Sequence, residues 1–170
     1  MKFEVSDQES KKAKVPHEIF LTNLVGNHIL WFIASLGLVR SYWQPLALVP
    51  VVSILLLGYT LWRARRSKAI DSWFVMCHWQ LCAGRSRAFI LTLSVFGFIA
   101  FLGWVGFTYF GMKEVAVMAM IGGAGVLPVM VTVLVLILME SDALHQATQH
   151  KLPNKMIERY PNPDIRVIED

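Results

Sequence analysis

The stretch AFILTLSVFGFIAFLGWVGFTYFGM, residues 88–112, contains no charged side chain. An α-helix needs roughly 20 mostly apolar residues to cross the hydrocarbon core of a bilayer, so this stretch is long enough to span one. Three other stretches are comparably apolar, although the second is slightly short. The four stretches are residues 19–39, 46–62, 88–112 and 115–139. The sequence therefore predicts an all-α membrane protein with four transmembrane helices.

The composition supports this class. Hydrophobic residues make up 55% of the 170-residue chain, and the mean hydropathy is +0.51. These values exceed those of a water-soluble domain. The first 18 residues are polar and of mixed charge, and no small-residue cleavage site follows the first apolar stretch. We therefore expect that stretch to be a permanent span rather than a secretory signal peptide.

The distribution of positive charge predicts the orientation in the membrane. Of the 16 lysine and arginine residues, only Arg40 and Lys113 lie between the first and second or the third and fourth apolar stretches. The others precede the first stretch, follow the fourth, or lie between the second and third. Because lysine and arginine concentrate on the cytoplasmic side of membrane proteins, we expect both termini in the cytoplasm. The predicted location is a bacterial inner membrane.

Short connections predict the order of the helices. Residues 40–45 and the neighbourhood of Lys113 leave room only for tight turns, so consecutive spans should pack as antiparallel neighbours. We expect two transmembrane hairpins, joined by a basic, tryptophan-rich helix at the membrane interface. The predicted parts are an N-terminal cytoplasmic tail (1–18), a first hairpin (19–62), an interfacial linker (63–87), a second hairpin (88–139) and a C-terminal cytoplasmic segment (140–170).

The linker has the features of a helix that lies in the headgroup layer. Asp71 or Ser72 is a suitable helix N-cap, and Gly84 a suitable helix end. Tryptophan rings anchor such a helix in the interface, and arginines contact anionic lipid phosphates. The residues predicted to contact lipid in this way are Arg63, Arg65, Arg66, Trp73, Trp79, Arg85 and Arg87.

The same linker contains Cys77, His78 and Cys82, which we also considered as a metal or redox site. A structural zinc site needs four converging ligands, usually as two close pairs. Five residues of helix place the two cysteines about 140° apart around the axis. Cytoplasmic thiols are normally reduced, and these are the only 2 cysteines of the chain. We therefore expect neither a metal nor a disulfide here, and no cofactor in the protein as a whole.

Nucleic-acid binding is not expected either. The linker does combine arginines with aromatic residues, as single-strand binding surfaces do. However, the membrane topology already explains its positive charge, and the net charge of the chain is only +4.

Small and polar residues within the spans predict helix packing. In lipid, glycine and alanine let helix backbones approach closely, and asparagines form hydrogen bonds between helices. The first span carries both kinds on one side, and the fourth carries a glycine-rich segment. The predicted packing residues are Asn23, Asn27, Ala34, Gly37, Ala119, Gly122, Gly123 and Gly125.

Two further places hold side chains that ligate metals. His28 is the one ionisable side chain deep in a span, and a histidine at such a position can ligate haem or relay protons. No second histidine lies at that depth in another span, so a packing role is the better interpretation.

Glu140 and its neighbours continue the fourth span into the cytoplasm, where we expect a solvated helix that ends before Pro153.

These features favour a noncatalytic membrane protein. No nucleophile–base arrangement or acidic pair is evident in the sequence, so we do not expect an enzyme. The leading prediction is an accessory, assembly or structural subunit of a larger inner-membrane complex. Its partners would be anionic lipids at the cytoplasmic face and other membrane subunits or further copies of itself. The alternative is a small oligomeric transporter or channel, although spans without buried charge weigh against transport.

Overall fold

The protein is a multi-pass helical membrane protein, as the sequence predicts. The computed structural model describes residues 1–39, 41–163 and 165–169, and most of these are helical. Within them, four helical segments are long and apolar enough to cross a membrane: Asp7–Leu38, Gln44–Ile70, Trp73–Phe110 and Glu114–Thr148. The chain divides into two compact units, Met1–Ser86 with Ile137–Asp170, and Arg87–Leu136.

The first membrane helix begins much earlier than its apolar stretch. Helix α1 (Asp7–Leu21) starts with a capping box, in which Ser6 Oγ accepts from the backbone N–H of Glu9 and the Glu9 carboxylate accepts from the N–H of Ser6. The segment continues through the π-helical η1 (Thr22–Trp31) into α2 (Phe32–Leu38). Much of the predicted N-terminal tail is therefore helical.

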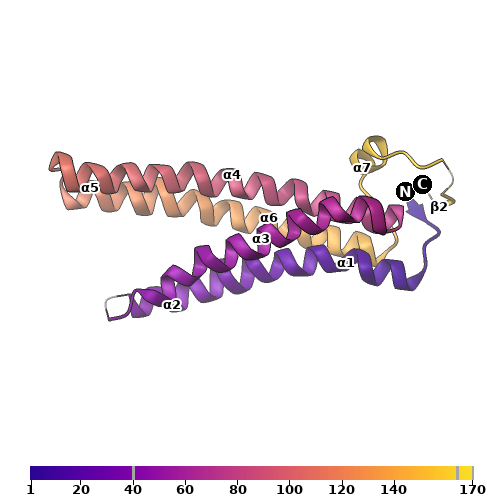
Figure 1. The fold of residues 1–170 in the computed structure, drawn as a ribbon, viewed down its shortest axis with the longest axis horizontal. Helices are drawn as coiled ribbons and strands as arrows, with labels where there is room; N and C mark the ends of the chain where they lie inside the picture. Colours follow the sequence, from indigo (N-terminus) through magenta and orange to yellow (C-terminus); the bar gives the residue numbers. More distant parts are fainter. Residues whose placement is uncertain (40, 164, 170) are drawn as a thin grey trace. The chain divides into compact units, whose positions relative to one another are not determined.

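Helix α3 (Gln44–Ile70) packs along α1, η1 and α2, and Figure 1 shows α1 and α3 side by side. It extends beyond the apolar stretch through the first part of the basic linker. The helix ends at Asp71, whose backbone is extended. Both carboxylate oxygens of Asp71 accept from the guanidinium of Arg63, at 2.7 and 3.0 Å. This bidentate pair holds the turn that leads into the next helix.

Helix α4 (Trp73–Phe110) is continuous, so our prediction that a separate interfacial helix ends at Gly84 is wrong. An isolated glycine costs a helix only about 1 kcal/mol relative to alanine. Neighbouring side chains on α4, including Ala83 and Phe89, are fully buried, which offsets that cost. Residues 73–87 are therefore the first turns of the third long helix.

The two ends of the chain meet in the first unit. Strand β1 (Lys2–Phe3) pairs antiparallel with β2 (Val167–Glu169), and Figure 1 shows the termini close together. Phe3 lies in a buried apolar cluster. This cluster also contains residues from α3, α4, α6 (Leu127–Thr148) and α7 (Asn154–Arg159). It forms a hydrophobic core outside the apolar spans.

In the second unit, the segment that follows α4 lies against α4. Helix α4 ends at Phe110, and Gly111 follows with a φ of 65°, a conformation that glycine adopts without steric cost. The chain then forms α5 (Glu114–Ala119) and the π-helical η2 (Met120–Val126), which leads into α6. A Cβ added at Gly125 would lie 3.7 Å from the carbonyl oxygen of Phe96. Gly125 therefore lies in close contact with α4.

Candidate functional site

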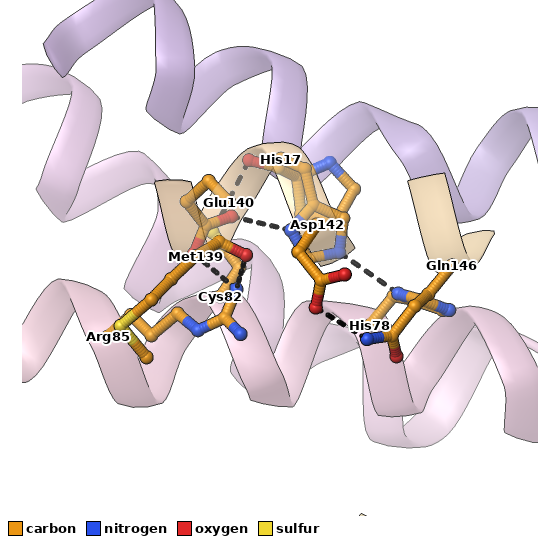
Figure 2. A network of polar contacts seen from close by, with 9 residues as sticks. His17, His78, Cys82, Arg85, Met139, Glu140, Asp142 and Gln146 are labelled. Atoms are coloured by element: carbon orange, nitrogen blue, oxygen red, sulfur yellow. Dashed lines mark hydrogen bonds and ion pairs between the residues drawn. The ribbon is translucent and has the colours of Figure 1, made fainter. Parts of the chain in front are cut away.

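The first unit contains a buried group of polar side chains contributed by three helices. His17 lies on α1 and Glu140 on α6, and both side chains are fully buried. His78, Cys82 and Arg85 lie on α4, and Figure 2 shows these side chains close to His17 and Glu140. We call these five residues the polar cluster.

The sequence positions of these residues explain why the cluster forms. His17 lies two residues before the first apolar stretch, and Glu140 directly follows the fourth. Arg85 lies shortly before the third. Charged and polar groups are costly within the hydrocarbon layer, so each stretch ends at about these residues. Helices that cross the same bilayer bring such boundary residues to one level, where they can contact each other.

The His17 ring connects the members of the cluster. Its Nδ1 is 2.5 Å from Oε2 of Glu140, and its Nε2 is 2.9 Å from Nδ1 of His78. Which ring nitrogen donates in each contact depends on the tautomers. Arg85 donates from Nη1 to Oε1 of Glu140 at 3.1 Å and to the carbonyl oxygen of Met139 at 2.9 Å. Glu140 therefore has one oxygen facing a guanidinium and the other facing an imidazole.

Cys82 completes the group. Its thiol donates to the carbonyl oxygen of Pro16 at 3.3 Å. The sulfur, a ring nitrogen of His17 and a carboxylate oxygen of Glu140 all lie within 4.8 Å of one another, and all three residues are buried. Cys77, by contrast, lies in the apolar cluster around Phe3. The two cysteines have different surroundings, as their angular separation on a helix implies.

Two buried polar atoms on α4 lack a hydrogen-bond partner among the described residues: Nε2 of His78 and Oγ of Ser86. The backbone of Lys151 lies close to His78, and the Ser86 hydroxyl lies close to Cys82. Neither approach satisfies the distance and angle of a hydrogen bond. A buried polar atom without a partner is costly and marks a place where water or an ion can bind.

Sequence reasoning missed the centre of this cluster. It placed Glu140 on a solvated helix, which is wrong, because the side chain is fully buried. It did not consider His17, which lies 61 residues before His78 and 123 before Glu140. The one available signal was the position of each polar residue at the edge of an apolar stretch.

The polar residues of the first span lie against α3. Asn27 donates from Nδ2 to the carbonyl oxygen of Val49 at 2.9 Å and to Oδ1 of Asn23 at 3.1 Å. Asn23 donates to Ser53 Oγ at 3.3 Å, and a ring nitrogen of His28 is 2.9 Å from the same hydroxyl. These contacts occupy the asparagines within the chain.

The predicted small residues differ in their surroundings. Ala34, Gly37, Ala119, Gly122 and Gly123 are exposed, whereas Gly125 is buried within the second unit. A Cβ added at Gly37, Gly122 or Gly123 would meet nothing within 4 Å. The close approaches that the sequence predicts are therefore made within the chain only at Gly125.

The predicted lipid-contacting residues fall into two groups. Trp79 is 2% exposed, with Arg63 4.9 Å above its ring, and Trp73 donates from Nε1 to the carbonyl oxygen of Tyr160 at 2.6 Å. These residues, like Arg85, make contacts within the protein. The side chains that remain exposed are Arg65, Arg66 and Arg87.

No protein-family model, curated protein or solved structure matches this chain. Its chemistry must therefore be inferred from its own geometry. The polar cluster can link α1, α4 and α6 through charge-assisted hydrogen bonds. Its nitrogen, sulfur and oxygen donors can also ligate a cation.

Proposed function

We propose that this chain is a noncatalytic subunit of a larger complex in a bacterial inner membrane. It joins its partners by packing membrane helices against theirs, and it offers a docking face in the cytoplasm. In this proposal the four spans form two antiparallel hairpins with both termini in the cytoplasm. The positive charge of the termini and of the segment between the second and third spans supports this orientation.

The observation that carries the proposal is the open space beside Gly122 and Gly123. Gly103 and Gly125 lie close to residues of the opposite helix in their own hairpin. Gly122 and Gly123 are exposed. A Cβ added at either position would have no atom within 4 Å apart from those of its chain neighbours and of the nearby backbone of its own helix. Small residues at a membrane-helix surface permit close approach by another helix. This face of η2 therefore suits a neighbouring membrane helix.

The exposed arginines support a docking face at the cytoplasmic ends of the helices. Arg65 and Arg66 on α3 and Arg87 on α4 are exposed, and Arg66 lies 5.7 Å from the Trp62 ring. Basic groups next to a membrane bind anionic headgroups at about 1 kcal/mol each. They also attract acidic surfaces of partner proteins.

A comparison of two glycine substitutions tests the proposal. Gly123→Leu adds bulk at the proposed contact, whereas Gly58→Leu adds the same bulk at another exposed glycine with nothing within 4 Å, on α3. Neither change should prevent folding, because both sites are open. We expect tagged wild-type protein and Gly58→Leu to co-purify with the same membrane partners in mild detergent after crosslinking. Gly123→Leu should lose those partners while its membrane insertion stays normal.

The alternative transporter or channel function predicts a different result. Purified protein alone, reconstituted in liposomes, would then conduct or transport a solute, and Gly123→Leu would reduce that flux. Transport by the isolated chain, together with recovery of the wild type without any partner, would overturn the subunit proposal.

A further inference from the structure

We propose that His17, Cys82 and Glu140 bind one divalent transition-metal ion, for which Zn²⁺ is the best match. This inference goes beyond the proposed subunit function. The three residues lie on α1, α4 and α6, and their ligand atoms are within 4.8 Å of one another. Zinc binds imidazole nitrogen, thiolate sulfur and carboxylate oxygen at about 2.0–2.3 Å. The site differs from the sequence-adjacent group of Cys77, His78 and Cys82, because its ligands come from distant parts of the chain.

The geometry requires only small adjustments to accommodate an ion. From those bond lengths, two donors on one tetrahedral ion lie about 3.3–3.6 Å apart. Nδ1 of His17 and Oε2 of Glu140 are 2.5 Å apart, which is within hydrogen-bonding distance. A metal ion bound between them would separate the two atoms by about 1 Å, within reach of ordinary side-chain rotation. The neutral His17 ring would then carry its proton on Nε2, which faces His78.

The neighbours of the three ligands are arranged as supporting groups. A histidine that binds metal usually donates its other N–H to a fixed partner. Here Nε2 of His17 faces Nδ1 of His78 at 2.9 Å, which leaves Nδ1 of His17 for the ion. Arg85 holds Oε1 of Glu140 and leaves Oε2 free in the same way. Three protein ligands leave a fourth position for water, and the Ser86 hydroxyl near Cys82 has no other partner among the described residues.

The charge balance favours a metal that binds thiolate. Arg85 is a positive charge beside the site and opposes any cation. On binding, Cys82 releases its thiol proton to solvent, so that its thiolate and the Glu140 carboxylate together match the charge of a divalent ion. Mg²⁺ and Ca²⁺ prefer an all-oxygen site and would not gain from the sulfur. The donor set therefore selects zinc and similar metals.

Metal binding by the purified full-length chain tests this proposal. The protein is stripped with a chelator in mild detergent and titrated with Zn²⁺ against a competing chromophoric chelator, and separately with Co²⁺. We expect about one ion per chain and, with Co²⁺, a thiolate-to-metal charge-transfer absorption. Cys82→Ser should abolish that absorption. It should weaken zinc binding more than about 100-fold, because loss of a supporting partner alone costs 10–100-fold.

Cys77→Ser is the matched control, since Cys77 is a buried cysteine on the same helix but lies in the apolar cluster. It should bind both metals like the wild type. Folded wild-type protein that binds no zinc at near-stoichiometric concentrations would overturn the proposal. So would a Cys77→Ser variant that loses the charge-transfer band while Cys82→Ser keeps it. Both readouts come from the isolated chain, so they do not depend on the partners invoked for the subunit function.

Discussion

Glu140 is the residue that ties the polar cluster together. Its side chain is fully buried and accepts from Arg85, and it lies beside His17. From the sequence, it is one of several polar residues after the fourth span, and helical periodicity does not distinguish it from its solvated neighbours. Its burial depends on side chains 55 and 123 positions away in the chain. A local pattern cannot predict such contacts, because they exist only once α1, α4 and α6 are packed.

We expect Glu140→Gln to destabilise the metal-free protein by about 3 kcal/mol. Removing one partner of a buried ion pair leaves the other charge uncompensated, which costs about 3–5 kcal/mol. The lower end applies because the Arg85 side chain keeps 13% exposure. The free energy of unfolding, measured by denaturant titration in mixed micelles with chelator present, checks this value.

Ser10→Ala is the control for that measurement. Ser10 donates to the carbonyl oxygen of Ala147 at 2.9 Å, a neutral hydrogen bond between the same two helices, α1 and α6. Its loss should cost only about 1 kcal/mol. If Glu140→Gln were no more destabilising than Ser10→Ala, the buried ion pair would not contribute as we describe.

At the scale of elements, apolar length predicts the four membrane helices but not where they end. Each stretch lies almost entirely within one long helical segment, because roughly 20 apolar residues leave few other structures in lipid. The ends differ because α1, α3, α4 and α6 extend past the apolar residues into polar sequence. There the helices are stabilised by the core around Phe3 and by the polar cluster. Both are tertiary features, and no local signal at Gly84 indicates them.

Two glycine-to-alanine changes test the continuity of α4. Gly84 is exposed, lies inside the helix and has nothing within 4 Å of an added Cβ. Gly84→Ala should therefore stabilise the protein by about 0.5–1 kcal/mol through higher helix propensity. Gly111, with a φ of 65°, follows the end of the helix, and Gly111→Ala should destabilise it by about 1 kcal/mol.

Thermal unfolding of both variants in the same detergent measures this contrast. An increase in midpoint temperature for Gly84→Ala and a decrease for Gly111→Ala is the expected result. A destabilising Gly84→Ala would indicate that a helix ends at residue 84, as for a separate interfacial helix.

At the scale of the whole molecule, the side of the membrane that each part occupies decides which partners it can meet. The paired termini, the exposed arginines and the polar cluster all belong to segments that the charge distribution assigns to the cytoplasm. A metal site there would be exposed to cytoplasmic metal buffering, and the docking face would meet cytoplasmic partners. The opposite orientation would place all these features outside the cytoplasm and remove the basis for the cytoplasmic docking face.

Cysteine labelling in intact cells tests this orientation most directly. One variant carries Ser41→Cys, between the first two spans, and another carries a cysteine appended after Asp170. Wild-type protein sets the background, because Cys77 and Cys82 are buried. With a maleimide that cannot cross the inner membrane, Ser41→Cys should be labelled in cells with a permeable outer membrane, and the appended cysteine only after lysis. Labelling of the appended cysteine before lysis, with Ser41→Cys protected, would contradict the account.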